Sequence, residues 1–304
     1  MHSDRFFILL STLLLLLLAA PACDRQHGAD DTPVVVTSIA PLGDWVRAVG
    51  GDAVRVEVLV PRNASPHTFE LRPRQLRDAG SAALIVFMGA GLEFWAEDLL
   101  ANANPDAAVL RLSEGAQLLQ TGEEHTHDHG DGHSHAEGNP HLWLDPLFAA
   151  DAAGRITEAL VKILPGQEDA LRNRAAAWKD SLRALDARIR TARAEWSQRL
   201  FVEDHSSWVY FAARYDLEQA GVIEATPGRE ISARELGALI TRMREKQVRA
   251  IFADARKSSR AADVLAEATG ASVARLDPIG SESTALRYLD LMRYNVREMT
   301  RILR

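Results

Sequence analysis

The feature that most constrains the fold is a stretch of about 32 residues, from Gln167 to Gln198, that contains neither glycine nor proline. Its apolar residues recur at alternating steps of four and three, the spacing of one buried stripe along a continuous α-helix. The stripe consists of Leu171, Ala175, Trp178, Leu182, Leu185, Ile189, Ala192 and Trp196. At a rise of 1.5 Å per residue, such a helix is about 48 Å long and exceeds one small domain.

Two arrangements are compatible with this helix. A coiled-coil dimer would use the stripe as its seam, but only about four heptads are present and alanine packs poorly at seam positions. The second arrangement is a single rod that lies across two lobes of a monomer and holds them together. We favour the rod, which has no hinge of its own and therefore predicts limited closure of the lobes.

Strand-like and helix-like segments alternate on both sides of this stretch, which predicts an α/β fold with mostly parallel sheets flanked by helices. The expected strands are 34–38, 54–60, 83–87, 107–112, 200–203, 220–223, 250–253 and 272–276. The other expected helices are 42–49, 73–79, 93–101, 148–164, 208–215, 233–246, 261–269 and 285–303. We expect an N-terminal lobe over residues 32–165, a linking helix over 166–198 and a C-terminal lobe over 199–304.

The first 23 residues are expected to lie outside the fold. A basic residue precedes an apolar run from Phe6 to Ala20, and small residues follow, which is the pattern of a secretory signal. The run is shorter than the roughly 20 residues of a membrane-spanning helix. Cys23, the only cysteine, falls at the cleavage point, as in a bacterial lipoprotein whose thiol is lipidated. The alternative is ordinary cleavage after Ala22, and both predict export to the periplasm or the outer face of the cytoplasmic membrane.

Charge and cysteine content exclude several classes of function. The formal net charge is −7 at pH 7 and basic clusters are lacking, which argues against a nucleic-acid partner. An acidic exported protein suits a cation instead. A single cysteine allows neither an intramolecular disulfide nor a zinc site built from four cysteine thiolates.

A histidine-rich tract occupies residues 123–138. Its five histidines, set among glycine and acidic residues, are His125, His127, His129, His133 and His135. Because the tract has almost nothing apolar to bury, we expect a solvated loop. Neutral imidazole suits zinc, copper and nickel better than magnesium or calcium, so the loop predicts weak secondary binding of a divalent metal. The alternative is a charged insertion that binds metal only incidentally.

Three further histidines and one aspartate follow or flank expected strand ends. His67 lies in the turn after strand 54–60, and His141 follows the histidine-rich tract. His205 and Asp277 follow strands of the second half. Ligands of open α/β sheets gather outside the carboxyl ends of the strands, so two side chains from each half predict a site in a cleft between lobes. Three imidazoles and one carboxylate fill a tetrahedral zinc shell.

At four places the sequence resembles the metal-binding motifs of the cluster A-I solute-binding proteins, the zinc and manganese receptors of ABC importers. The matching segments, in chain order, are SPHTFELRP, NPHLWLDP, EDHSSWVYFAARYDLE and RLDPIG. The resemblance extends from about Val34 to Leu303. The zinc branch of this family, which is ZnuA-like, often has a histidine-rich insertion just before its second ligand.

The resemblance implies two α/β lobes joined by a rigid helix, with one metal ion in the cleft. The implied ligands are His67, His141, His205 and Asp277. It also implies delivery of the metal to a membrane permease driven by a cytoplasmic ATPase. The chain departs from the usual family pattern at two positions that are not expected ligands. Asn139 stands where Asp is more usual, and Asp254 stands where Glu is common.

Ligand chemistry favours zinc over manganese. Manganese prefers carboxylate oxygens, and the manganese branch of the family typically has Glu where this chain has His205. A manganese or broad divalent-metal receptor remains the alternative. A zinc hydrolase with Asp277 as its base is more distant, because the chain has neither an HExxH motif nor a nucleophile elbow. Relatives have also been called adhesins, but nothing in the sequence indicates an adhesive module. We expect a zinc receptor that is not an enzyme.

Some neighbours of the expected ligands are candidates for supporting roles. Glu70, Asp145 and Asp204 are expected to orient ligand imidazoles through their second ring nitrogen. Trp143 and Trp208 are expected to wall the cleft by packing.

Overall fold

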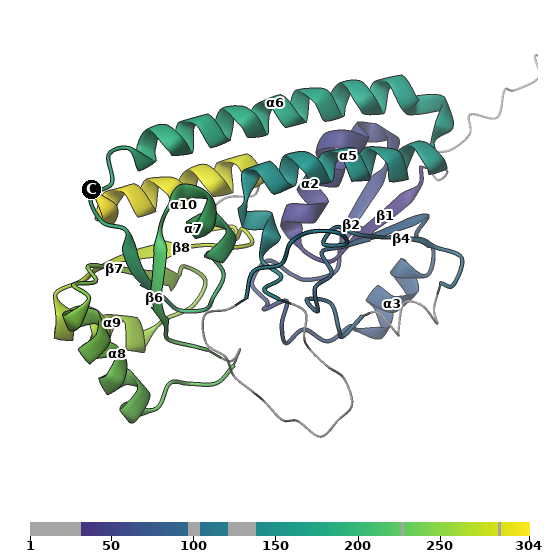
Figure 1. The fold of residues 1–304 in the computed structure, drawn as a ribbon. Helices are drawn as coiled ribbons and strands as arrows, with labels where there is room; N and C mark the ends of the chain where they lie inside the picture. Colours follow the sequence, from purple (N-terminus) through teal and green to yellow (C-terminus); the bar gives the residue numbers. More distant parts are fainter. Residues whose placement is uncertain (1–31, 97–103, 121–137, 226–227, 285–286) are drawn as a thin grey trace, which may run out of the picture. The chain divides into compact units, whose positions relative to one another are not determined.

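The computed structural model describes residues 32–96, 104–120, 138–225, 228–284 and 287–304. Two four-stranded sheets form its framework, with strand orders β2-β1-β3-β4 and β6-β5-β7-β8 (Figure 1). The strands are β1 Val34–Thr37, β2 Arg55–Val58, β3 Leu84–Phe87, β4 Ala108–Arg111, β5 Leu200–Glu203, β6 Glu218–Val222, β7 Ala250–Asp254 and β8 Ser272–Leu276. Every pairing is parallel. The fold class predicted from the sequence is therefore confirmed.

Composition explains which strands are central. The strands β1 and β3 read VVVT and LIVF and are buried along their whole length. Continuous runs of this kind suit parallel strands that are covered by helices on both faces. The edge strands β2 and β4 are partly exposed. Because every strand pairing is parallel, the carboxyl ends of the strands within each sheet lie along one common edge, from which loops can present side chains.

Helices connect and cover the strands. They are α2 Ala40–Gly50, α3 Pro73–Ala79, α5 Pro146–Ile163, α6 Glu168–Arg193, α7 Val209–Tyr215, α8 Ala233–Glu245, α9 Arg260–Thr269 and α10 Tyr288–Leu303. Local signals fix several of their starts. Asp145 caps α5 by accepting the Leu147 N–H, and Ser232 forms a reciprocal capping box with Glu235 at the start of α8. Such caps satisfy backbone donors that the first helical turn leaves unpaired.

The helix expected over 93–101 is not seen in its described part, where residues 93–96 form turns. The carboxylate of Glu93 folds back and accepts the backbone N–H groups of Met88 and Gly89, both at 2.9 Å. It also accepts the Ser38 hydroxyl at 2.6 Å. Gly89 has a φ of 80°, which residues with a side chain rarely adopt. These hydrogen bonds hold residues 93–96 in turns instead of a helix, and the spacing of apolar residues does not predict them.

The long helix α6 ends at Arg193, five residues before the expected end. The chain turns there because it is tied to α10. The Trp196 indole N–H donates to the Thr300 hydroxyl at 3.0 Å, and the Gln198 N–H donates to the Leu303 carbonyl at 2.9 Å. Along its length α6 packs on α2, α5 and α10 (Figure 1). It therefore joins helices that belong to both halves of the chain.

One apolar core runs through both halves. Its members include Trp45 of α2, Trp143, Leu182 of α6 and Tyr288 of α10. The rings of Trp45 and Tyr288 meet edge to face with centroids 5.4 Å apart. Residues 33–304 accordingly form one compact unit. The boundaries expected for the lobes, 32–165 and 199–304, stay a prediction.

Several expectations concern residues outside the described part. These are the signal segment 1–23 with Cys23, and the loop histidines His125, His127, His129, His133 and His135. Among the helices that the structure describes, none is both long and apolar enough to cross a membrane.

The packing of α6 generates a stability prediction. Leu182 is fully buried, whereas the side chain of its neighbour Arg183 is 66% exposed. Leu182→Ala should lower the free energy of unfolding by about 2–5 kcal/mol, because it removes buried methyl groups and leaves a cavity. Arg183→Ala is the matched control and should change that free energy by less than about 1 kcal/mol. Equal losses in urea unfolding would contradict the buried face assigned to α6.

Candidate metal site

Three histidine side chains converge from distant parts of the chain. His67 lies in the turn beyond β2, His141 precedes a short 3₁₀ helix at Leu142–Leu144, and His205 follows β5. The Nε2 atom of His67 lies 3.2 Å from Nε2 of His141 and 3.2 Å from Nε2 of His205. The candidate ligand atoms of the three residues all lie within 4.8 Å of one another. Among the residues described, this is the group that could hold a metal ion.

The spacing of these nitrogens fits a tetrahedral zinc ion. Zinc binds imidazole nitrogen at about 2.0–2.1 Å, so tetrahedral geometry separates neighbouring nitrogens by roughly 3.3–3.4 Å. Two of the three separations are 3.2 Å, close to that value. The rings also differ in orientation, with interplanar angles of 47°, 65° and 68°. The rings therefore approach one point from three directions without stacking.

Burial keeps the three rings neutral. It lowers the pKa of His67 to about 3, with further lowering by His205 and Arg256. Burial is also the main reason that the pKa of His141 lies well below its usual value. The pKa of His205 is lowered by burial too, although the backbone carbonyl of Glu224 opposes that shift. Neutral imidazoles carry the lone pairs that a metal needs.

The second ring nitrogen of His141 has a specific partner. Its Nδ1 atom lies 2.9 Å from Oδ1 of Asn139, which also accepts the His141 backbone N–H at 2.9 Å. Because an amide oxygen only accepts, Nδ1 carries the proton and Nε2 offers its lone pair to the site. The amide nitrogen of Asn139 donates to the Ser206 carbonyl at 2.6 Å, next to the third histidine. Asn139 thus orients one ring and ties it to the neighbourhood of another.

The carboxylates expected to orient the imidazole rings have other partners or are exposed. Asp145 forms an ion pair with Arg214, and Asp204 accepts the Ser259 hydroxyl at 2.6 Å and the Asp254 N–H at 2.8 Å. Glu70 is exposed. In the described part of the chain, no hydrogen-bond partner of suitable geometry reaches the buried Nδ1 of His205. The Asn-Pro-His sequence was the available signal for the role of Asn139, since a residue two positions before a ligand can bond back to it.

The two tryptophans behave differently. Trp143 lines the cavity beside the histidines, with its ring centroid 4.9 Å from that of His141. Its indole N–H donates to the Pro278 carbonyl at 2.7 Å, so it also connects the two halves of the chain. Trp208 is buried against Phe211 and does not line this cavity.

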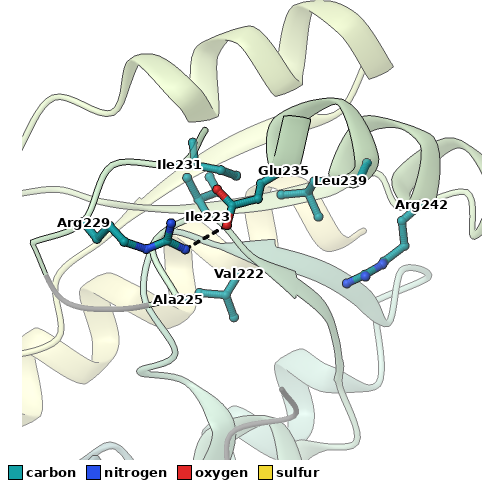
Figure 2. A pocket seen from close by; sticks show the side chains of 9 residues that line it. Val222, Ile223, Ala225, Arg229, Ile231, Glu235, Leu239 and Arg242 are labelled. Atoms are coloured by element: carbon teal, nitrogen blue, oxygen red, sulfur yellow. Dashed lines mark hydrogen bonds and ion pairs between the residues drawn. The ribbon is translucent and has the colours of Figure 1, made fainter. Parts of the chain in front are cut away.

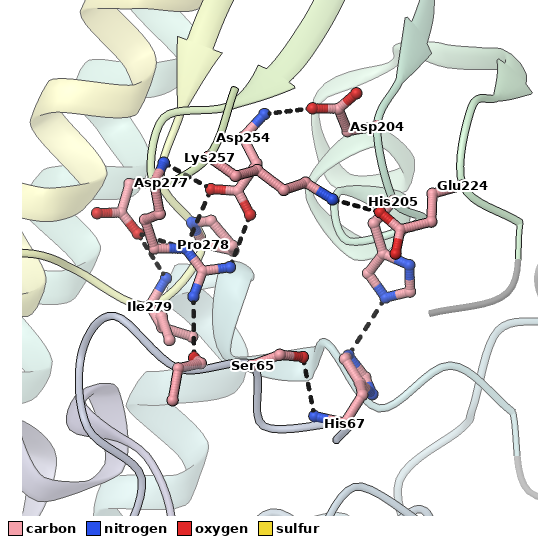
Figure 3. A network of polar contacts seen from close by, with 12 residues as sticks. Ser65, His67, Asp204, His205, Glu224, Asp254, Lys257, Asp277, Pro278 and Ile279 are labelled. Carbon is pink, nitrogen blue, oxygen red and sulfur yellow. Dashed lines mark hydrogen bonds and ion pairs between the residues drawn. The ribbon is translucent and has the colours of Figure 1, made fainter. Parts of the chain in front are cut away.

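The fourth expected ligand, Asp277, lies outside the group of three histidines. It is fully buried at the end of β8, and its Oδ1 accepts the N–H groups of Ile279 and Gly280 at 3.1 and 2.8 Å. Its Oδ2 accepts the Thr284 hydroxyl. Figure 3 draws Asp277 on the opposite side of the polar network from His67 and His205. The structure therefore brings three of the four expected ligands together and holds the fourth apart.

The histidines face a cavity of about 240 Å³ whose lining comes from both halves of the chain. Its charged wall pairs Arg256 with Asp254 and Lys257 with Glu224. A second cavity, of about 130 Å³ beside β6 and α8, is drawn in Figure 2. Its lining is apolar apart from Arg242 and the Arg229–Glu235 ion pair, and it includes no histidine. The chemistry suited to a metal is therefore confined to the first of these two cavities.

Comparison with known proteins gives a consistent result. The sequence model of the family described as ZnuA, "Zinc-uptake complex component A periplasmic", matches residues 35–302. The zinc-binding lipoprotein AdcA of Streptococcus pneumoniae is 28% identical over 300 residues, which cover 96% of this chain and 60% of AdcA. The high-affinity zinc uptake system protein ZnuA of Bacillus subtilis is 28% identical over 271 residues, with 86% and 85% of the two chains covered.

Solved structures agree with the fold. A crystal structure of ZnuA superposes with a TM-score of 0.79 at 28% identity, covering 90% of this chain and all of that one. The chain thus spans the full length of that structure but only about 60% of the length of AdcA. These similarities are to metal-binding solute receptors and not to enzymes, in agreement with the expectation from the sequence.

The neutral histidines generate a prediction about the metal-free protein. His67 binds a proton in the unfolded chain near its usual pKa of 6.5 but in the folded protein only near 3. The stability that the neutral His67 contributes is therefore fully present above pH 6.5 and is lost as the pH falls towards 3. Between pH 7 and pH 5, wild-type protein should lose about 1–2 kcal/mol more of its free energy of unfolding than His67→Gln.

Wild-type protein is compared with His67→Gln because Glu203 changes the free energy of unfolding with pH in the opposite direction to His67. Burial raises its pKa to about 8, so its contribution to stability is present below pH 4.5 and is lost as the pH rises through 8. Both proteins contain Glu203, and the difference between them removes its effect. Denaturant unfolding in the presence of a chelator measures this difference, and identical pH profiles would contradict a buried neutral His67.

Proposed function

The chain belongs to the ZnuA family of periplasmic components of zinc-uptake complexes, and we propose that it captures Zn²⁺ and delivers it to an ABC permease. The permease is driven by a cytoplasmic ATPase. The single observation that carries this proposal is the convergence of three neutral imidazoles, with Nε2 of His67 3.2 Å from Nε2 of both His141 and His205. Three imidazole nitrogens of this kind suit a borderline-soft divalent cation such as zinc.

We propose that His67, His141 and His205 bind the ion first. They are close together already, so binding requires no large movement and no loss of protons at neutral pH. Asp277 is the proposed fourth ligand, reached by a local rearrangement of the loops that carry it. Zinc is the cargo here, so the site must release it as well as hold it.

Zinc is favoured over manganese by donor chemistry. Manganese is served by carboxylate oxygens, whereas three imidazole nitrogens suit zinc and its softer neighbours. The names of the relatives from Streptococcus pneumoniae and Bacillus subtilis both specify zinc. A manganese or broad divalent-metal receptor is the second candidate, and direct competition between the two metals separates these possibilities.

Hydrogen bonds across the cleft support capture by small local movements. The Trp143 indole N–H donates to the Pro278 carbonyl at 2.7 Å, and the Tyr288 hydroxyl donates to the Trp143 carbonyl at 2.6 Å. The Tyr210 hydroxyl donates to the Asn139 carbonyl at 2.6 Å. Each of these bonds is buried and costs free energy to break. Together with the rod-like α6, they favour limited closure of the lobes.

The remaining parts of the proposal concern location and the histidine-rich tract. The protein is exported and acts as a monomer in the periplasm or at the outer face of the cytoplasmic membrane. Lipidation of Cys23 would hold it near its permease. The loop histidines His125, His127, His129, His133 and His135 bind additional zinc weakly and raise its local concentration.

Removing any one of the three imidazoles should greatly lower the zinc affinity of the tight site. His67→Ala, His141→Ala and His205→Ala should each weaken zinc binding by at least about 100-fold, because two nitrogens cannot fill the shell. The measurement is a titration of metal-stripped protein against a chelator of known zinc affinity. A variant that binds zinc as tightly as wild type would remove its histidine from the site.

Deleting residues 123–138 is the complementary change. The shortened protein should bind fewer zinc ions in total while keeping one tight site, since none of the three converging histidines lies in the deleted segment. Manganese titrated in parallel should bind far more weakly than zinc to that site. Loss of the tight zinc site would mean that the loop supplies ligands, and equal manganese affinity would favour the second candidate function.

A further inference from the structure

Arg256 lies between the three histidines and Asp277. It lines the cavity that the histidines face, whereas Asp277 is fully buried and does not line it. The Nε atom of Arg256 is 3.8 Å from Oδ1 of Asp277. Its Nη1 donates at 3.3 Å to the carbonyl of Ala64, in the turn that carries His67. The guanidinium thus contacts both the proposed fourth ligand and the turn of the first.

The position of this guanidinium is fixed by Asp254. Arg256 Nε donates to Oδ1 of Asp254 at 3.0 Å and Nη2 donates to Oδ2 at 2.7 Å. The backbone N–H of Arg256 also donates to Oδ1 at 2.8 Å. A bidentate pair of this kind restrains both position and orientation. Both side chains are 14% exposed, so solvent screens the guanidinium only partly.

Asp277 needs a positive neighbour when no metal is present. Its side chain is 0% exposed, and a buried carboxylate without a compensating charge is strongly unfavourable. Its other partners are uncharged, namely the N–H groups of Ile279 and Gly280 and the hydroxyl of Thr284. Among the described ion pairs of Asp277, Arg256 provides the cation.

We propose that Arg256 is the built-in counter-cation of Asp277 and that zinc must compete with it for this carboxylate. This inference rests on the proposed function and extends it by assigning Arg256 a role in setting the affinity for zinc. Arginine stays charged at every physiological pH, so the competition does not depend on protonation. When zinc leaves, the guanidinium again pairs with Asp277, so the buried carboxylate keeps a cation beside it.

This arrangement has a direct consequence for affinity. Before zinc can use the Asp277 carboxylate, the ion pair between Asp277 and Arg256 must be broken, and losing such a pair costs more in a partly buried site than in water. Arg256 should therefore weaken zinc binding and hasten zinc release. A receptor that passes its cargo to a permease benefits from both effects. Removing the charge should then produce a tighter site, which is the opposite of what damage to the site would produce.

The test measures zinc affinity and the rate of zinc transfer to a chelator. Arg256→Gln should bind zinc at least about tenfold more tightly and release it correspondingly more slowly. Arg256→Met, which also removes the charge, should behave in the same way, whereas Arg256→Lys should stay near wild type. Lys257→Gln is the matched control, because Lys257 lines the same cavity but pairs with Glu224.

A double-mutant cycle with Asp277→Asn identifies the mechanism. In that background Arg256→Gln should have little effect on affinity, because the contested carboxylate is gone. An equal gain with and without Asp277, or an equal gain in Lys257→Gln, would overturn the inference and leave only a general charge effect. Unchanged or weaker binding in both Arg256→Gln and Arg256→Met would also overturn it.

Failure of this inference is distinguishable from failure of the proposed function. If wild-type protein lacks a tight zinc site that depends on the histidines, the proposed function fails. If that site is present and only the Arg256 variants depart from expectation, the receptor function stands and the role of Arg256 falls.

Discussion

The apolar core shared by the two halves of the chain is the constraint on which the rest depends. His67 and His205 are 138 positions apart in sequence, yet their Nε2 atoms lie 3.2 Å from each other. Their positions in the sequence do not explain that proximity. It follows from α6 packing on helices of both halves and from buried hydrogen bonds such as that between Trp143 and Pro278. The candidate metal site is thus a product of tertiary packing.

The same packing is consistent with the proposed role of zinc as a transported cargo rather than a permanent cofactor. Burial keeps the imidazoles neutral, so zinc does not have to displace protons. Asp277, the proposed fourth ligand, lies apart from the histidines and pairs with Arg256, so the proposed shell is incomplete before zinc arrives. In the proposed site, zinc affinity depends on three histidines that already lie close together and on one carboxylate for which Arg256 competes. Such a balance permits capture at low concentration and release to a partner.

The sequence predicted the elements better than the contacts of individual side chains. All eight strands were expected within about two residues of their positions, because buried parallel strands have continuous runs of β-branched and aliphatic residues. His67 and His205 could be singled out because they follow β2 and β5, whose carboxyl ends lie at the edge of a parallel sheet, whereas His141 was indicated by its NPHLWLDP motif. The helix at 93–101 was wrong in its described part because Glu93 bonds back to the loop before it. The roles of Asn139 and Arg256 depend on side-chain direction, which periodicity does not encode.

X-ray absorption at the zinc edge would show directly whether these three imidazoles hold the transported zinc. The sample is protein without residues 123–138 that is loaded with one equivalent of zinc, so that loop histidines do not contribute. We expect three imidazole nitrogens at about 2.0–2.1 Å and one oxygen ligand. Parallel spectra of the His67→Ala, His141→Ala and His205→Ala variants should each lose one imidazole. A shell with fewer than three imidazoles, or one unaltered by these substitutions, would contradict that expectation.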